Sequence, residues 1–77
     1  MKVKVYSTPA CVYCHMVKEF LKNNKVKFEE IDVSTNEEAA HEMIEKSGQM
    51  GVPVIDIDGK IIVGYNIPAL KEALELK

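Results

Sequence analysis

Residues 6–17 read YSTPACVYCHMV, and the hydrophobic periodicity of the chain changes within them. Before this stretch, valines alternate with lysines, which predicts a strand over residues 2–6. After Pro9 the apolar residues follow a helical period, which predicts a helix over residues 11–24. The expected inner positions of that helix are Tyr13, Met16, Val17, Phe20 and Leu21. The stretch is therefore a strand-to-helix turn that carries the two cysteines of the chain.

The middle of the chain predicts a second strand and a second helix. A β-rich run over residues 26–33, with one slip in its alternation, predicts a strand that is bulged or lies at a sheet edge. A capping box that begins at Ser34 or Thr35 predicts the start of a helix that ends at Gly48. The expected inner face of this helix is Ala40, Met43 and Ile44.

The last third of the chain predicts a hairpin and a terminal helix. Asp58-Gly59 separates β-rich runs over residues 51–57 and 60–63, and a type I′ turn needs positive φ at both of its central positions. Asn66 can cap a last helix. Its expected buried positions are Ile67, Leu70 and Leu74. The order β-α-β-α-β-β-α predicts an α/β fold in which a four-stranded mixed sheet is flanked by three helices.

The length and charge of the chain exclude several classes of protein. With 77 residues, the sequence predicts one domain over residues 1–77. Its net charge is −2, and it has no basic cluster of the kind that binds nucleic acid. No apolar run approaches the ~20 residues of a membrane span, and the N-terminus alternates instead of forming a signal peptide. We therefore expect a cytoplasmic monomer that binds neither nucleic acid nor a membrane.

The two cysteines are three residues apart at the expected start of the first helix. A helix N-terminus favours a thiolate, because its first amides lack partners and its dipole is positive there. Cys14 is in phase with Val17 and Leu21 and should face the core, whereas Cys11 is in phase with His15 and should face solvent. We expect Cys11 to attack a substrate disulfide, and Cys14 to resolve the mixed disulfide as an intramolecular bond.

Other side chains near the pair have simpler interpretations. His15, one turn after Cys11, could support the thiolate or guide an anionic substrate, but a solvated histidine on a helix is the simpler interpretation. We expect Lys18, Lys22 and His41 at the surface. We expect Met16, Phe20 and Met43 in the core.

Three stretches together resemble the glutaredoxin family, which has the thioredoxin fold. They are YSTPACVYC at residues 6–14, GVPVIDIDGK at residues 51–60 and VGY at residues 63–65. The resemblance implies that Pro53 is cis and that the Val52 backbone lies beside the cysteines, where it can pair with a substrate backbone. It also implies that Tyr13 flanks a groove for glutathione or an extended substrate segment. The alternative for Tyr13 is packing on the buried helix stripe.

The chain departs from the family pattern at several positions. Val12 stands where the family commonly has proline, and Thr8 stands where a basic residue often binds a glutathione carboxylate. Gly64, Tyr65 and Asn66 replace a Gly-Gly-x-Asp-Asp segment, and we expect them to line the glutathione site. The amides that begin the last helix would be available to a carboxylate there. This region resembles small glutaredoxin-like redoxins that are reduced by thioredoxin reductase or a related flavoprotein.

These features predict a thiol–disulfide oxidoreductase with no bound cofactor and no metal. Glutathione is the expected co-substrate, a flavoprotein of the thioredoxin reductase type is the alternative electron donor, and disulfide-containing proteins are the expected substrates. Some relatives carry selenocysteine at the position of Cys11, or share an iron–sulfur cluster between two chains. The sequence leaves both of these properties open.

The cysteine motif has two other interpretations. Cys-x-x-Cys-His over residues 11–15 matches the attachment signature of c-type haem, which would need a mostly helical fold and a further ligand. The candidates for that ligand are His41, Met43 and Met50. Small copper carriers also place two cysteines after a first strand, but they commonly have methionine where Pro9 stands and follow another order of elements. Two thiols alone also make a poor zinc site.

Overall fold

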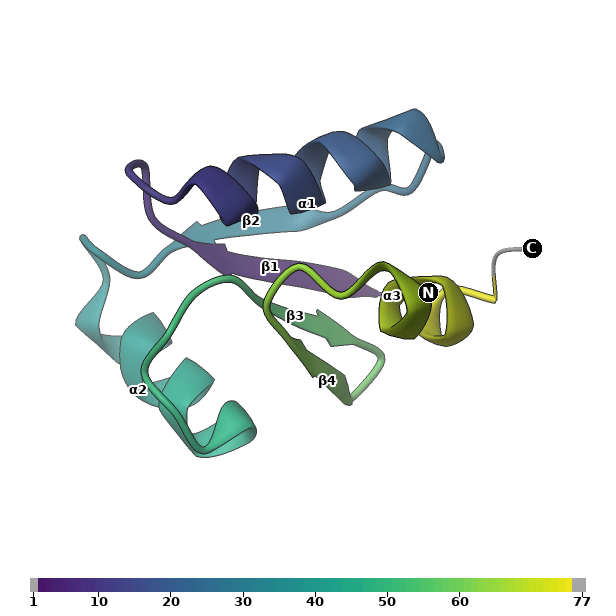
Figure 1. Cartoon of the computed structure of the whole chain (residues 1–77). Coiled ribbons are helices and arrows are strands. Elements are labelled where there is room, and N and C mark those ends of the chain that lie inside the picture. The colour runs from purple at the N-terminus through teal and green to yellow at the C-terminus, as the bar shows by residue number, and fades with distance from the viewer. Residues whose placement is uncertain (1, 76–77) are drawn as a thin grey trace.

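The computed structural model describes residues 2–75, and its elements follow the expected order (Figure 1). The strands are β1 (Val3–Ser7), β2 (Glu29–Asp32), β3 (Val54–Ile57) and β4 (Lys60–Val63). The helices are α1 (Val12–Asn23), α2 (Glu37–Ser47) and α3 (Ile67–Ala73). Within residues 2–75, no helix has the length and apolar character that a membrane span requires.

The four strands form one mixed sheet in the order β2-β1-β3-β4. β1 and β2 are parallel, whereas β3 is antiparallel to both β1 and β4. Helices α1 and α3 cover one face of the sheet and α2 covers the other, as Figure 1 shows. The predicted four-stranded mixed sheet with helices on both faces is confirmed.

Each face of the sheet has its own apolar cluster. Under α1 and α3, the helix residues Val17, Leu21, Leu70 and Ala73 pack against the strand residues Val3, Val5, Ile55, Ile57 and Ile62. Under α2, Ala39 and Met43 pack against Tyr6 and Val54. The central strands β1 and β3 supply both clusters, because successive side chains of a strand point to opposite faces.

The turn and cap predictions at the C-terminal side are confirmed. Asp58 and Gly59 have φ of 49° and 91°, as a type I′ hairpin turn requires. Asn66 caps α3 by accepting a hydrogen bond from the Ala69 amide at 3.2 Å. Gly48 ends α2 with φ of 73°.

The capping box that was expected to begin at Ser34 or Thr35 is wrong. The N-cap of α2 is Asn36, whose side chain accepts from the Ala39 amide at 3.0 Å. Ser34 instead donates both its backbone N–H and its hydroxyl to the Asp32 carboxylate. The N-cap is therefore two residues after Ser34 and one after Thr35, at an asparagine, another residue type that favours this position.

Other expected boundaries and exposures also differ from the structure. β2 covers only Glu29–Asp32 of the run predicted over residues 26–33, although it does lie at the sheet edge. β3 begins at Val54 instead of residue 51. Met16, expected in the core, is exposed, because the sheet covers α1 only along the stripe of Cys14, Val17 and Leu21. Phe20 is only half-buried.

A polar network fixes α2 to the sheet. The buried Tyr6 donates its hydroxyl to Glu42 at 2.6 Å, and Lys46 donates to the Tyr6 oxygen at 3.1 Å. Lys46 also pairs with Glu42 at 2.9 Å and with the buried Asp56 at 2.7 Å. The hydrogen bond from Tyr6, together with Lys46, lowers the pKa of Glu42 from 4.5 to about 2.

We expect Glu42→Gln to weaken the acid dependence of folding stability. A carboxyl group whose pKa is depressed on folding contributes stability above its unfolded pKa, and this contribution is lost as pH falls toward the folded value. The window is therefore between pH 4.5 and about 2. Urea unfolding across this window should show a smaller loss of stability in Glu42→Gln than in the unchanged chain. Glu45→Gln, at an exposed position of the same helix, is the control, and equal acid dependence in all three proteins would contradict the prediction.

Candidate functional site

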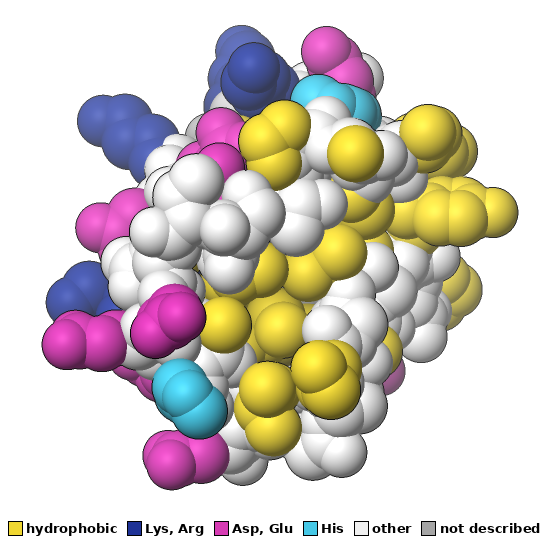
Figure 2. Space-filling view, turned by 90° about the vertical axis from the view of Figure 1, so that its left-hand side faces the viewer, with side chains coloured by type: hydrophobic (Ala, Val, Ile, Leu, Met, Phe, Trp, Pro, Cys, Tyr) yellow, Lys and Arg dark blue, Asp and Glu magenta, His cyan; other side chains and the backbone are white. Residues whose placement is uncertain are grey.

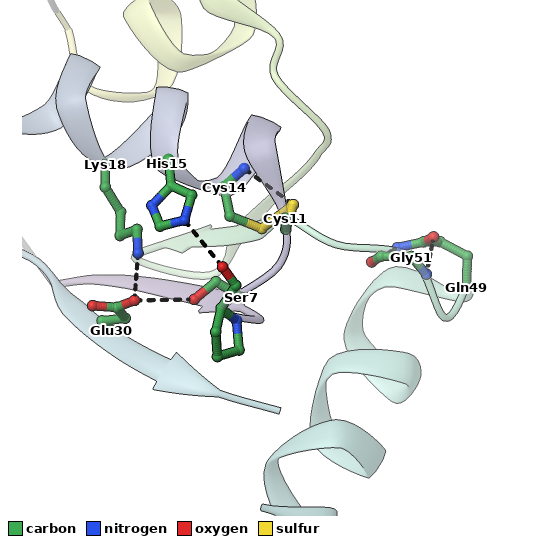
Figure 3. Close-up of a disulfide and its surroundings, with 9 residues drawn as sticks. Ser7, Cys11, Cys14, His15, Lys18, Glu30, Gln49 and Gly51 are labelled. Carbon is green, nitrogen blue, oxygen red and sulfur yellow. Dashed lines mark hydrogen bonds and ion pairs between the residues drawn. A yellow bond between two sulfur atoms is a disulfide. The ribbon is translucent and has the colours of Figure 1, made fainter. Parts of the chain in front are cut away.

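The two cysteines lie where β1 passes into α1. Cys11 is the N-cap residue of α1, and its Sγ accepts a hydrogen bond from the Cys14 amide at 3.1 Å. The structure shows the oxidised form, in which Cys11 and Cys14 form a disulfide with their Cα atoms 5.2 Å apart (Figure 3). Cys14 is fully buried and Cys11 is half-buried, so Cys11 is the more accessible of the two sulfurs.

The position of Cys11 favours a negative charge on its sulfur. An N-cap side chain faces amides that have no partner within the helix, and the helix dipole is positive at this end. After reduction, the Cys14 N–H would hydrogen-bond to a Cys11 thiolate in the same place where it now contacts the disulfide sulfur. The local geometry can therefore support a nucleophilic thiolate at Cys11.

The segment before β3 lies beside the cysteine turn. Tyr6 pairs with Val54 in the sheet, so Pro53 follows in register next to Ser7, from which the chain continues toward Cys11. The Val52-Pro53 peptide bond is cis, as the family resemblance implied. Pro53 is buried and Val52 is half-buried. That the Val52 backbone pairs with a substrate stays a prediction.

A third segment, from β4 to α3, completes this end of the molecule. The Gly64 amide donates to the Pro53 carbonyl at 2.8 Å. The ring of Tyr65 stacks on the ring of Tyr13, with centroids 6.4 Å apart and an interplanar angle of 24°. Tyr13 is 60% exposed, so its alternative interpretation as a buried helix residue is wrong. The structure thus brings the cysteine turn, the Val52-Pro53 segment and the Gly64-Tyr65 segment together.

Asn66 lies in the same segment but is occupied by the helix. It is exposed, its side-chain oxygen caps α3, and its backbone amide donates to Gly64 at 3.1 Å. Its side chain therefore has a local structural partner, and its role in glutathione binding stays a prediction.

Lys18 was expected at the surface, and this expectation is wrong. Its side chain is 13% exposed and pairs with Glu30 of β2 at 2.5 Å (Figure 3). The buried Ser7 donates to the same Glu30 oxygen at 3.3 Å. The hydrogen bond from Lys18 is the main cause that lowers the pKa of Glu30. This network joins α1, β1 and β2 close to the disulfide, and it depends on strand pairing that no local pattern reveals.

His15 is exposed, as expected, but it is not free of contacts. Its Nε2 lies 3.1 Å from the Pro9 carbonyl oxygen, to which the ring donates. The contact joins the first turn of α1 to the proline turn that precedes Cys11. A role of His15 toward the thiolate or an anionic substrate stays a prediction.

Gln49 makes a contact that the sequence did not indicate. Its side-chain amide pairs with the Gly51 backbone: Gly51 N–H donates to Gln49 Oε1 at 2.6 Å, and Gln49 Nε2 donates to the Gly51 carbonyl at 2.9 Å. Ser47 adds a hydrogen bond from its hydroxyl to the Gln49 carbonyl at 3.0 Å. We call the two hydrogen bonds between Gln49 and Gly51 the Gln49–Gly51 bracket, and Figure 3 shows it at the end of α2. It fixes the backbone one residue before Val52.

The alternative readings of the motif find no support in this arrangement. The β-rich sheet is not the mostly helical fold that a small c-type cytochrome needs, and the order of elements differs from that expected for a copper carrier. Residues 2–75 contain no group of three or more His, Cys, Asp or Glu side chains that could hold a metal ion.

Sequence comparisons agree on one family. The glutaredoxin family model matches residues 3–62. An uncharacterized glutaredoxin-like 8.6 kDa protein of Clostridium pasteurianum is 42% identical over 73 residues, which cover 95% of this chain and 97% of that protein. Glutaredoxin 3 of Escherichia coli is 39% identical, with 80% of this chain and 75% of that protein covered. The glutaredoxin-like protein NrdH of Lactococcus lactis is 35% identical, with coverage of 82% and 86%.

Solved structures match the same architecture. The T8A mutant of a thioredoxin-like protein, BC3987, superposes with a TM-score of 0.93 at 36% identity, and the match covers 99% of this chain and 97% of that one. The glutaredoxin-like NrdH-redoxin of Escherichia coli superposes with a TM-score of 0.85 at 26% identity, with coverage of 94% and 93%. The fold of this chain is therefore the thioredoxin fold.

Proposed function

Since the chain belongs to the glutaredoxin family and has its fold and adjacent cysteines, we propose that it is a dithiol thiol–disulfide oxidoreductase with Cys11 as nucleophile. The observation that carries this proposal is the pairing of an accessible Cys11 at a helix N-cap with a buried Cys14 at disulfide distance. The substrates are protein disulfides or mixed disulfides with glutathione.

The reaction proceeds in two exchanges. The Cys11 thiolate attacks one sulfur of the substrate disulfide, forms a mixed disulfide and releases the other sulfur as a thiolate that takes up a proton. Cys14 then loses its proton and attacks Cys11 Sγ, which forms the intramolecular disulfide and releases the second substrate thiol. The substrate gains two electrons from the cysteine pair and two protons, one from Cys14 and one from solvent, because the attacking Cys11 is already a thiolate. Regeneration requires an external reductant.

The surrounding segments have complementary roles in this proposal. The Val52 backbone pairs with an extended substrate, as a strand edge does. Tyr13 and Tyr65 form one wall of the substrate groove, and Gly64 and Asn66 lie at the end where glutathione would bind. The hydrogen bond from the Gly64 amide to the Pro53 carbonyl joins these two substrate-binding segments.

Glutathione and a flavoprotein of the thioredoxin reductase type are the two candidate donors. Similarity to glutaredoxin 3 favours glutathione, whereas similarity to two NrdH proteins, together with Thr8 in place of a basic residue, favours the flavoprotein. The test is reduction of a protein disulfide by this protein with either glutathione and glutathione reductase or NADPH and thioredoxin reductase. If the dithiol form of the protein reduces no disulfide at all, the proposed function is refuted.

We expect Gln49→Ala to raise the KM for a protein disulfide while changing kcat little. The substitution removes both hydrogen bonds to Gly51, and each such bond is worth about 1 kcal/mol, so a rise of roughly thirtyfold is the order of magnitude. Steady-state kinetics of disulfide reduction measures it. Gln49→Glu is the matched variant: it keeps an acceptor for the Gly51 amide but loses the donor, and it should give an intermediate KM. An unchanged KM in Gln49→Ala would show that the bracket does not position the Val52 segment.

A further inference from the structure

The Lys18–Glu30 ion pair links α1 to β2 and has no role in the two thiol–disulfide exchanges described above. Lys18 Nζ lies 2.5 Å from Glu30 Oε2, and the buried Ser7 donates its hydroxyl to the same oxygen at 3.3 Å. The hydrogen bond from Lys18 is the largest cause that lowers the pKa of Glu30, so Glu30 is a carboxylate at neutral pH.

Two observations place this ion pair close to the cysteines. Lys18 follows Cys14 by one helical turn, and side chains so spaced on a helix share a face, with Cβ atoms about 5–6 Å apart. Ser7 is the last residue of β1, directly before the turn that leads to Cys11, and it is buried, as Cys14 is. Figure 3 shows the Lys18 side chain extending from α1 to Glu30, on the side of the helix where the disulfide lies.

The surroundings of the cysteines screen these charges less than water would. Figure 2 looks at the end of the molecule that carries the cysteine turn, where hydrophobic side chains occupy the middle of the face and charged ones lie toward its edges. Cys14 is fully buried. The Lys18 side chain is 13% exposed and the Glu30 side chain 49%, so the lysine charge acts on the sulfurs with less screening than the carboxylate does.

Reduction of the disulfide creates a charge on which this ion pair can act. The Cys11–Cys14 disulfide is neutral. When it gains two electrons and one proton, it becomes a Cys11 thiolate and a Cys14 thiol. A nearby cation stabilises the thiolate and a nearby anion destabilises it, whereas neither acts on the neutral disulfide in this way. Charges beside the cysteines therefore change how readily the disulfide is reduced.

We propose that the Lys18–Glu30 ion pair sets the reduction potential of the Cys11–Cys14 couple, with Lys18 stabilising the reduced form and Glu30 offsetting part of this effect. The inference rests on the proposed function and names the residues that tune the same site. Lys18→Gln leaves the Glu30 carboxylate behind, so the disulfide becomes harder to reduce. Glu30→Gln leaves the Lys18 cation without its counter-charge, so the disulfide becomes easier to reduce.

The test is the equilibrium of the full-length chain with a glutathione redox buffer, measured by mass spectrometry after acid quenching and alkylation of free thiols. Two glutathione thiols lose two electrons and two protons as they form glutathione disulfide; one proton goes to Cys14 and the other to solvent. At neutral pH, the equilibrium constant for reduction of the chain should fall roughly fivefold in Lys18→Gln, as expected for one partly screened charge. It should rise roughly threefold in Glu30→Gln, less because this carboxylate is half exposed.

Further variants separate charge from structure. Lys18→Met keeps an unbranched side chain without its charge and should repeat the fall seen in Lys18→Gln, whereas Lys18→Arg keeps the charge and should change the constant little. The double variant Lys18→Gln/Glu30→Gln loses both charges and should return to within about twofold of the unchanged chain. Lys22→Gln and Glu29→Gln, at exposed positions of the same helix and the same strand, are the controls for a change in net charge.

An ion pair that only holds α1 on the sheet would give another pattern. Both single variants would then lose unfolding free energy in urea, while the equilibrium constant would stay unchanged or move in the same direction in both, and either result would overturn the inference. Shifts of the same size in Lys22→Gln and Glu29→Gln would also overturn it. If the cysteines of the unchanged chain do not exchange with glutathione at all, the proposed function itself is refuted.

Discussion

Cys11→Ser is expected to abolish disulfide-reductase turnover, by roughly a thousandfold or more, because it removes the attacking sulfur. The substitution is a clean test of chemistry, since serine is a favoured N-cap residue and its hydroxyl can accept the Cys14 amide as Cys11 Sγ does now. Helix α1 should therefore keep its start. The measurement is NADPH-coupled reduction of a protein disulfide, with circular dichroism to confirm that the fold is retained.

Cys14→Ser is the matched variant, and its expected behaviour differs by substrate. Cys11 can still attack, but the mixed disulfide then waits for an external thiol. Reduction of a small glutathione mixed disulfide should persist, whereas reduction of a protein disulfide should be lost, because the buried Cys14 normally resolves that intermediate. Substantial turnover by Cys11→Ser, or identical behaviour of the two variants, would contradict the division of roles between the cysteines.

Leu21→Ala is expected to cost about 2–5 kcal/mol of unfolding free energy, the largest stability effect that we predict. Leu21 is fully buried in the cluster that joins α1 and α3 to the sheet. Its truncation loses apolar burial and leaves a cavity among side chains held by three elements. A protein of this length has a total stability of about 4–12 kcal/mol, so the variant loses a large share of it.

Urea unfolding of the reduced protein measures this loss. The midpoint should fall strongly with an unchanged slope, and the melting temperature should drop by about 4–8 °C for each kcal/mol lost. Lys22→Ala removes the exposed neighbouring side chain and should stay close to the unchanged chain. Equal midpoints for the two variants would mean that α1 does not pack on the sheet as described.

The parts of the fold that local chemistry determines could be predicted from the sequence. The change of period around Pro9, the positive φ demanded by Asp58-Gly59 and the cap at Asn66 each depend on a few neighbouring residues. The inward position of Cys14 follows from its phase with Val17 and Leu21 on one helix. For these features the local preference and the tertiary structure agree.

The features that sequence reasoning missed depend on neighbours distant in the chain or on competing local bonds. The Lys18–Glu30 pair exists only because β2 runs parallel to β1 beneath α1. Tyr13 stacks on Tyr65 at the surface, and only the folded chain brings these two distant residues together. Ser34 donates hydrogen bonds to Asp32 and so does not cap α2, and Asn36 is the N-cap instead. Residue preferences alone do not decide between these two local hydrogen-bond patterns.

In the candidate site, too, some features could be predicted from the sequence and others could not. The cysteine spacing predicted that Cys11 and Cys14 could pair, and the family resemblance correctly implied the cis bond at Val52-Pro53. The bracket between Gln49 and Gly51 has no sequence signature, because a side-chain amide two residues from a glycine is common in loops that make no such contact. The exposure of Met16 was missed because Met16 has the helical phase of a core residue, yet the sheet leaves it uncovered.

Trapping the mixed disulfide shows which of the two sulfurs the substrate meets first. Cys14→Ser is mixed with a disulfide-containing protein, the adduct is isolated without reductant, and the linked residue is located by peptide mass spectrometry. We predict a stable one-to-one adduct linked through Cys11, and no comparable adduct with Cys11→Ser. An adduct that forms equally well through Cys14 in the Cys11→Ser chain would contradict the assignment of Cys11 as the nucleophile.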